Sequence, residues 1–181
     1  NYTVDDIVAR AGKTILMSVR NGTTRLRTHA DVDSIVGLKA IEGLLEVKKS
    51  FSDLVDIQIV AFPQEGILRD PGTEDLLWKA MDMGADIVGG MPHHEREPKH
   101  WEKHIEAVFQ VAKHNDADID MHVDETDDPA IRSLEVLAEK TISESYQGRV
   151  TAGHTCALAA YPDKYAEAVI AKVKVADIHL I

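Results

Sequence analysis

Histidines and acidic residues recur in short polar segments whose spacing could support metal chemistry. In the segment DMHVDE (120–125), His122 is followed three residues later by Glu125. A neutral imidazole is a good ligand for zinc or iron, and a nearby carboxylate can take a proton from a metal's water and return it to a leaving group. His122 and Glu125 are therefore candidate site residues. The alternative is that Glu125 and Asp127 only cap the helix expected to begin near Pro129.

Two further segments carry side chains suited to the same chemistry. His154 in TAGHT (151–155) could orient a metal's hydroxide, or it could simply bond to a loop carbonyl. Gln64 in FPQEGI (62–67) offers both a donor and an acceptor, so its amide could read the paired N–H and C=O of a pyrimidine-like or triazine-like ring. The alternative for Gln64 is an ordinary turn built on Pro63 and Gly66.

The remaining histidines offer weaker signals. His93, His94 and Glu95 match the H-x-E half of the zinc nucleobase-deaminase signature, but its P-C-x-x-C half is absent from a chain with one cysteine. We expect His93 to line a pocket and His94 to be solvated. His100 and His104, four residues apart on a helix, could share a metal. A solvated helix face is the preferred interpretation for that pair.

Composition restricts the class of protein. The chain has 181 residues and a formal net charge of -11, which argues against nucleic-acid binding because phosphate recognition needs clustered basic side chains. A hydrophobic share of 44% supports a buried core, and we find no apolar run of the roughly 18 residues that span a bilayer. We therefore predict a cytoplasmic protein that binds no membrane. The single cysteine, Cys156, leaves His and carboxylates as metal ligands, and we expect it to be a small buried side chain.

Hydrophobic periodicity predicts alternating strands and helices without a linker, and so a single domain over residues 1–181 with a parallel sheet. The predicted strands are Thr24–Val32, Asp56–Phe62, Ile87–Met91, Ile119–Val123, Arg149–Gly153 and Asp177–Ile181. The predicted helices are Val4–Arg20, Ile35–Phe51, Glu74–Met83, Trp101–His114, Ala130–Ser145 and Lys164–Val173.

Polar side chains lie at or just past the C-terminal ends of five of these strands, at intervals of 35, 29, 29 and 32 residues, namely His29, Gln64, His93, His122 and His154. A strand plus a helix has this length, and functional residues at C-terminal strand ends are typical of a (β/α)8 TIM barrel. The glycine-rich phosphate loops that would favour a doubly wound sheet are absent. Such barrels have about 250 residues. We therefore expect an incomplete barrel of about six strands, the central part of a longer protein.

These segments together resemble the amidohydrolase superfamily, and within it the bacterial cytosine deaminase group with its relatives that act on triazines. The resemblance covers nearly the whole chain and is strongest in RLRTHADV (25–32), IQIVAFPQEGI (57–67), GADIVG (84–89), MHVDE (121–125) and VTAGHT (150–155). It implies a distorted (β/α)8 barrel in which a divalent metal, zinc or iron, activates water to attack a carbon–nitrogen bond of a cyclic substrate. By this resemblance His122 is a metal ligand, Glu125 the proton shuttle, His154 the residue that holds the hydroxide, and Gln64 a substrate contact.

The departures from the family pattern are equally informative. The family's paired His-x-His ligands and its later Asp ligand have no counterpart here, and one imidazole cannot fix a catalytic metal against water. We therefore expect a hydrolytic deaminase or related carbon–nitrogen hydrolase in the full-length protein, and no activity or bound metal in these residues alone. The sheet's open edges should be covered by another copy of the chain, in a homo-oligomer, or by rearranged segments. The alternative is a complete small α/β module that binds a ligand without catalysis.

Overall fold

The computed structural model describes residues 2–181, in which six strands alternate with six α-helices. The strands are β1 (Arg25–Asp31), β2 (Asp56–Phe62), β3 (Ile87–Gly90), β4 (Asp118–Val123), β5 (Val150–His154) and β6 (His179–Leu180). The helices are α1 (Val4–Arg20), α2 (Lys39–Ser50), α3 (Thr73–Met83), α4 (Trp101–His114), α5 (Ser133–Ser143) and α6 (Asp163–Val175). Three short 3-10 helices are η1 (Pro92–His94), η2 (Pro98–His100) and η3 (Cys156–Ala160).

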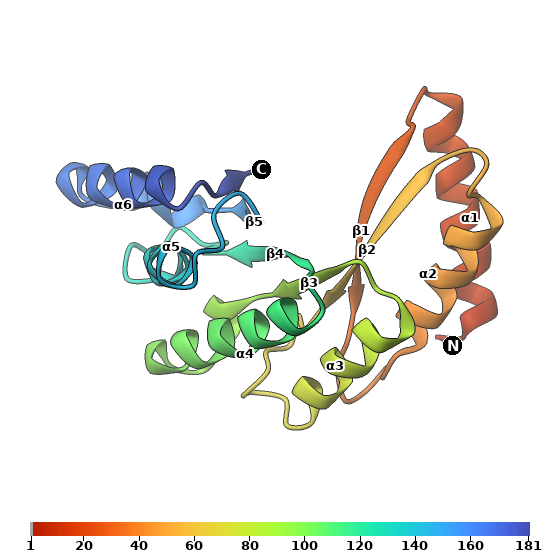
Figure 1. The fold of residues 1–181 in the computed structure, drawn as a ribbon, viewed down its shortest axis with the longest axis horizontal. Helices are drawn as coiled ribbons and strands as arrows, with labels where there is room; N and C mark the ends of the chain where they lie inside the picture. Colours follow the sequence, from red (N-terminus) through yellow and green to blue (C-terminus); the bar gives the residue numbers. More distant parts are fainter. Residues whose placement is uncertain (1) are drawn as a thin grey trace.

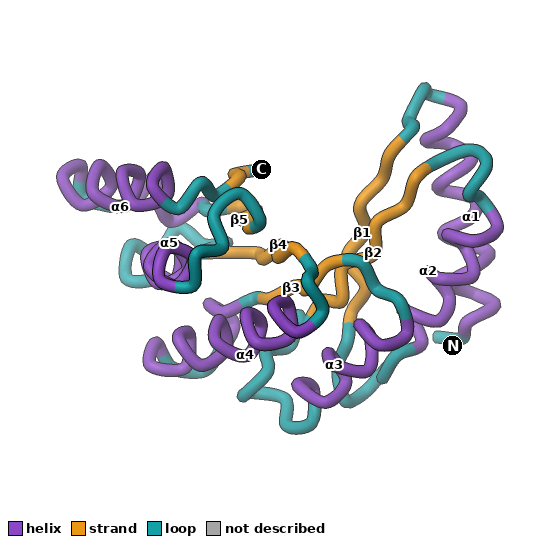
Figure 2. Tube along the Cα trace, in the orientation of Figure 1, coloured by secondary structure: helices purple, strands orange, loops and turns teal. Residues whose placement is uncertain are grey.

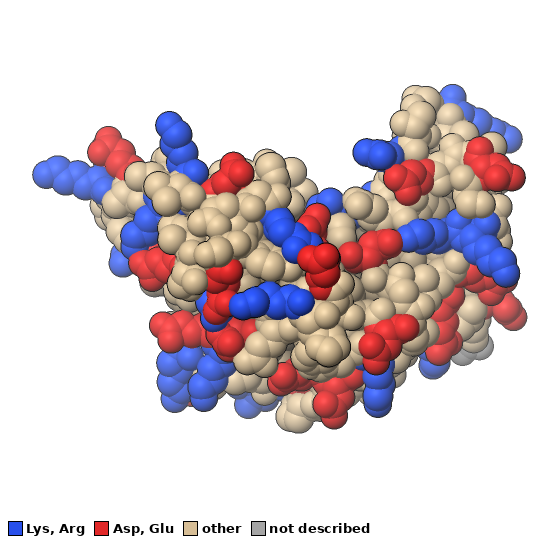
Figure 3. Space-filling model, in the orientation of Figure 1, with Lys and Arg blue, Asp and Glu red and all other residues tan. Residues whose placement is uncertain are grey.

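The six strands form one parallel sheet in the order β1-β2-β3-β4-β5-β6. The sheet curves strongly, and the helices lie along its outer, convex side (Figures 1 and 2). The space-filling view shows a face that is hollowed between the two ends of the sheet, with acidic and basic side chains interspersed (Figure 3). This half-barrel confirms the predicted incomplete (β/α)8 barrel of about six strands.

The core lies mainly between the sheet and its helices. Ile57 and Ile59 of β2 pack into it with Leu77 of α3 and Ile105 of α4, and all four side chains are almost fully buried. Phe62, on the opposite face of β2, is also buried. Burial on both faces is typical of parallel strands, because crossover helices cover one side and the barrel interior the other. No helix within residues 2–181 is long and apolar enough to cross a membrane.

Several predicted elements have the predicted bounds, including Val4–Arg20, Trp101–His114 and Asp56–Phe62. The other strands and helices overlap the predicted ones with shifted ends, and the strand predicted over Asp177–Ile181 shrinks to the two residues of β6.

The helix predicted over Ile35–Phe51 begins four residues late. The carboxylate of Asp33 accepts hydrogen bonds from the backbone N–H groups of Ile35 and Val36, at 2.7 and 2.8 Å. This local turn competes with helix formation, as short acidic side chains commonly do, and α2 starts only after it.

The expectation for Cys156 is wrong, because its side chain is exposed. It begins η3, where the following residue, Ala157, takes the buried position instead.

Close packing of β3 against β2 predicts a strict size limit at Gly89. A Cβ added there would lie 2.7 Å from the Ala61 carbonyl oxygen and 2.7 Å from the Phe62 ring. Gly89→Ala should therefore lower the free energy of unfolding by about 1–3 kcal/mol, measured by urea denaturation. The control is Gly12→Ala in α1, where the nearest atoms are ring carbons of Phe51 at 3.4 Å and alanine favours the helix. Equal stability of Gly89→Ala and the wild type would contradict this account.

Candidate metal and proton-transfer site

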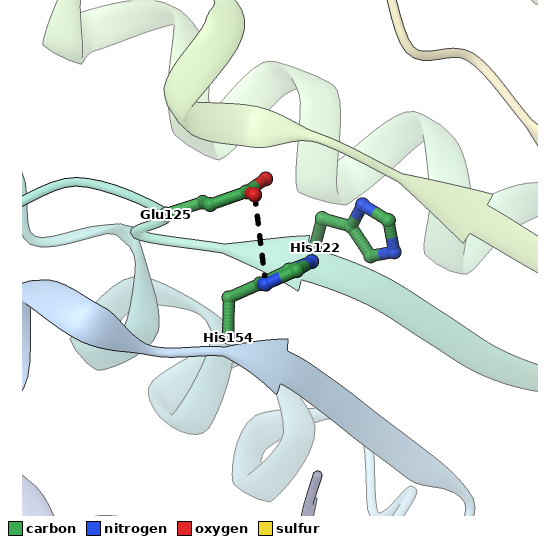
Figure 4. A group of neighbouring side chains, drawn as sticks. All are labelled: His122, Glu125 and His154. Carbon is green, nitrogen blue, oxygen red and sulfur yellow. Dashed lines mark ion pairs between the residues drawn. The ribbon is translucent and has the colours of Figure 1, made fainter.

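Three of the predicted site residues converge at the C-terminal ends of β4 and β5. His122 lies on β4, Glu125 follows it in the loop, and His154 ends β5. One ligand atom from each lies within 4.8 Å of the others. The two imidazole rings are edge to face with centroids 4.4 Å apart, and His154 Nδ1 lies 3.6 Å from Glu125 Oε1 (Figure 4). Imidazole and carboxylate groups so arranged can contribute ligands to a divalent cation or exchange protons.

The backbone turns sharply at the C-terminal ends of β4 and β5, where the three side chains meet. Asp124, His154 and Thr155 all have positive φ angles, of 51°, 71° and 51°. The N–H of Thr155 donates to the carbonyl of Val123 at 2.8 Å, and the N–H of Ala157 donates to the carbonyl of Asp124 at 3.1 Å. Left-handed conformations at non-glycine residues cost roughly 1 kcal/mol or more each and are common at functional sites. Here they turn both chain segments at the strand ends while the segments stay bonded to each other.

Asp124 fixes the segment that carries Glu125. Its carboxylate, in a residue only 1% exposed, accepts hydrogen bonds from the N–H groups of Ser133 and Leu134 at the start of α5, at 2.9 and 3.0 Å. The hydroxyl of Tyr161 lies 3.1 Å from the same carboxylate and 2.6 Å from the carbonyl oxygen of Ile131, and its one proton is shared between these two acceptors. Burial and the nearby charge of Asp124 raise the pKa of Tyr161, so its phenol stays protonated and acts as a donor.

This arrangement settles which acidic residue binds the start of α5. The alternative that Glu125 and Asp127 cap that helix is wrong, since the acceptor is Asp124. The helix also begins at Ser133 rather than at the predicted Ala130. Its first two N–H groups, of Ser133 and Leu134, are the ones that bind the Asp124 carboxylate. The side chain of Glu125 is left exposed beside His154.

The surroundings of His122 keep its imidazole neutral. Burial, together with the neighbouring rings of His29 and His154, lowers the pKa of His122 to about 4. At neutral pH the ring therefore carries a free lone pair, which metal binding requires.

A buried carboxylate on β4, that of Asp120, is held by two side chains of β1. Asp120 is fully buried and accepts a hydrogen bond from Arg27 Nη1 at 2.7 Å, while His29 Nε2 lies 3.4 Å from its other oxygen. Burial alone would raise the pKa of Asp120, but the hydrogen bonds from His29 and Arg27 outweigh it and hold the pKa below its usual range. The His29 ring lies 4.6 Å from that of His122.

Gln64 does not join the three-residue cluster. It lies in the loop after β2, at the same end of the parallel sheet, and its side chain is exposed. The N–H of Gly66 donates to the carbonyl of Pro63 at 3.0 Å, so the alternative of a turn on these two residues is also correct. The turn and the exposed amide are compatible, because the turn leaves the Gln64 side chain free.

The expectation of a solvated face at His104 is wrong. His104 is 0% exposed, and its Nδ1 lies 2.8 Å from Glu95 Oε1. The helical pattern contains the missed signal, because Trp101, Ile105 and Val108 share its face of α4 and are buried as well. His93 and His94, expected in a pocket and in solvent, are both partly buried.

Comparisons with known proteins give consistent matches along the chain. The model of the amidohydrolase family matches residues 10–181. The N-isopropylammelide isopropyl amidohydrolase of Pseudomonas sp. (strain ADP) is 39% identical over 170 residues, which are 94% of this chain and 42% of that protein. The pterin deaminase of Rhizobium rhizogenes is 29% identical over an alignment of 182 positions, which covers 100% of this chain and 41% of that protein.

The solved structures agree with this. The 5-methylcytosine deaminase from Klebsiella pneumoniae, liganded with 5-fluorocytosine, superposes with a TM-score of 0.95 at 40% identity, covering 98% of this chain and 43% of that one. An N-isopropylammelide isopropylaminohydrolase from Burkholderia multivorans gives a TM-score of 0.81 at 32% identity, and the match covers 96% of this chain and 43% of that one. The chain thus spans about two-fifths of the length of these relatives.

The role of Asp124 leads to a stability prediction. Asp124→Asn places an amide N–H₂ group against the backbone N–H of Ser133 or of Leu134, which can only donate, so a buried hydrogen bond must be lost. The free energy of unfolding should fall by about 1–3 kcal/mol, as measured by urea denaturation. Asp127→Asn, at an exposed carboxylate of the same loop, is the matched control and should be neutral. Two variants of equal stability would show that the Asp124 network contributes little.

Proposed function

Because this chain belongs to the amidohydrolase family, we propose that the protein carrying it hydrolyses a carbon–nitrogen bond of a small cyclic nitrogenous substrate. The observation that carries the proposal is the convergence of His122, Glu125 and His154 within 4.8 Å at the ends of β4 and β5. The relatives support the substrate class, since their names give an ammelide, a pterin and a methylated cytosine as substrates. A pyrimidine or an aminated triazine is the proposed substrate.

A divalent metal fits the donors that the structure brings together. Imidazole and carboxylate groups suit zinc and iron alike, and His122 is uncharged at neutral pH. When bound, the metal would supply a water of lowered pKa as the nucleophile. His122 is the ligand that the family resemblance assigns. Because a single ligand holds a metal poorly, we propose that further ligands come from outside these residues, and that the 181-residue chain alone is inactive.

The remaining roles follow from exposure and position. Glu125 is an exposed carboxylate, 3.6 Å from His154, and can take a proton from the attacking water. It then delivers that proton to the amino nitrogen attached to the ring carbon as the carbon–nitrogen bond breaks, so that ammonia or an amine leaves. His154 would hold the attacking water in place. The Gln64 amide would accept from a ring N–H and donate to a ring C=O.

We also propose that the sheet's outer edges are covered in the assembled protein. β1 and β6 are the end strands of the sheet, and beside β1 lies a hollow of about 300 Å³ lined by apolar side chains such as Ile7, Ile15 and Leu26. Unpaired strand edges next to apolar surface favour association. The rest of the full-length protein or a second copy in a homo-oligomer would supply the cover. The single domain over residues 1–181 and the cytoplasmic location stay predictions.

Glu125→Gln tests the proton-transfer role in the full-length protein. The substitution keeps the size and hydrogen-bonding capacity of the side chain but removes its basicity. The value of kcat should fall by about 10²- to 10⁴-fold while metal content and ring binding are retained, measured with cytosine and aminated triazines. Glu167→Gln, on an exposed position of α6, should leave turnover unchanged. Near-normal turnover of Glu125→Gln would mean that the proton is carried elsewhere. If the full-length protein turned over none of these substrates, a ligand-binding module without catalysis would be favoured instead.

Gln64→Ala tests the substrate contact. Loss of the amide should raise KM about tenfold, equivalent to roughly 1.4 kcal/mol, with a smaller effect on kcat. Steady-state kinetics of the full-length protein measure both constants. The control is Gln110→Ala, at an exposed glutamine of α4. An unchanged KM in Gln64→Ala would remove Gln64 from the substrate site without affecting the assignment of Glu125.

A further inference from the structure

A buried carboxylate–imidazole pair lies outside the cluster of His122, Glu125 and His154. Glu95, 6% exposed, follows β3, and His104, 0% exposed, lies on α4. His104 Nδ1 and Glu95 Oε1 are 2.8 Å apart. The proposed chemistry uses neither residue. Burying an ionisable pair is costly unless every polar atom has a partner.

The hydrogen bonds define the protonation of the pair. The N–H of Met91 donates to His104 Nε2 at 3.0 Å, so the ring's proton lies on Nδ1 and is donated to Glu95. Burial lowers the pKa of His104 despite the neighbouring carboxylate, and the ring is neutral. Burial would raise the pKa of Glu95, but hydrogen bonds from His104 and from the N–H groups of Leu68 and Ile67 outweigh it and lower the pKa. The carboxylate is therefore charged and its charge is held by donors.

Those donors come mainly from the loop after β2. Glu95 Oε1 accepts from the N–H groups of Ile67 at 2.7 Å and Leu68 at 3.1 Å, and Oε2 accepts from the N–H of Arg69 at 3.0 Å. Consecutive backbone N–H groups that converge on one anion form a compact and rigid nest. Gly66 permits this close approach for two reasons. Its φ of +92° lies in the left-handed region that favours glycine, and a Cβ there would lie only 3.0 Å from Glu95 Oε1.

The segment that Glu95 holds, residues 67–69, begins three residues after Gln64. Gln64 itself is held by His94, whose Nδ1–H group donates to the Gln64 carbonyl oxygen at 2.7 Å. Two neighbouring residues of the β3–α4 connection, His94 and Glu95, thus hold the backbone at Gln64 and at residues 67–69. The Gln64 side chain itself remains exposed and available to a ligand.

We propose that Glu95, oriented by His104, is a positioning residue that fixes the loop of residues 63–69 so that Gln64 presents its amide to the substrate ring. The inference rests on the proposed role of Gln64. A preorganised amide binds a ring more tightly than a mobile one, because less conformational entropy is lost on binding. Glu95 and His104 touch no substrate in this scheme and act only through the loop.

A double-mutant cycle in the full-length protein tests the proposal. In Glu95→Gln, the amide N–H₂ group faces either a backbone N–H or the His104 N–H, which breaks the nest. KM for cytosine or an aminated triazine should rise roughly 3- to 10-fold with kcat nearly unchanged. In the Gln64→Ala background the same substitution should change KM by less than about twofold, because the contact that the loop positions is already gone.

A second variant and a direct readout keep the test decisive if Glu95→Gln folds poorly. His94→Ala removes the other hold on the loop without disturbing a buried charge, and its smaller rise in KM should also vanish with Gln64→Ala. Hydrogen exchange of the N–H groups of residues 67–69 should accelerate in Glu95→Gln. Glu97→Gln, at an exposed carboxylate of the same connection, is the matched control and should change none of these quantities.

The outcomes separate the two proposals. Equal rises in KM in both backgrounds, or a fall in kcat at constant KM, would overturn the positioning role and leave Glu95 with a general structural one. An unchanged KM in the single variant Gln64→Ala would overturn the substrate contact and the positioning role with it, whereas loss of turnover in Glu125→Gln would still support the proposed reaction.

Discussion

The site depends on the way one buried carboxylate ties together strands that are not neighbours. Asp120 of β4 bonds to Arg27 and His29 of β1, although β2 and β3 lie between these strands in the sheet. Contact is possible only because the sheet curves, bringing the concave faces of β1 and β4 toward each other. A carboxylate that is 0% exposed needs such partners, since an unpaired charge in the interior would cost several kcal/mol. His122, two residues further along β4, projects from the same face of the sheet as Asp120.

The carboxylates of the chain divide into two kinds with different surroundings. Asp120, Asp124 and Glu95 are buried, and each has its charge held by several donors, respectively from β1, from the start of α5 and from the β2–α3 loop. Asp120 links β4 to β1, Asp124 links the loop after β4 to the start of α5, and Glu95 holds the loop after β2. Glu125 is exposed and lies close to His154. The proposed proton transfer at a fixed distance requires rigid support of this kind beneath the carboxylate.

The sequence predicts the strands, the parallel sheet and the location of the site, because each depends on a periodic pattern. Polar residues after five successive strands must gather at one end of a parallel sheet, and His122 and His154 do so. It predicts less well those features set by a side chain bonding to a distant backbone. The late starts of α2 and α5 depend on Asp33 and Asp124, and neither acceptor can be distinguished by sequence from its acidic neighbours. The burial of His104 was detectable from helical spacing, but its partner Glu95 was not.

We propose that His122 binds a metal that the full-length protein needs and that the 181-residue chain alone does not hold. The direct measurement is the metal-to-protein ratio, by elemental analysis after purification without chelators, for the full-length protein, its His122→Ala variant and the isolated chain. The account predicts roughly one zinc or iron per full-length chain, with the ratio falling toward zero in the variant and in the isolated chain. A full-length protein that turns over substrate without metal, or a His122→Ala variant that keeps its full metal content, would contradict it.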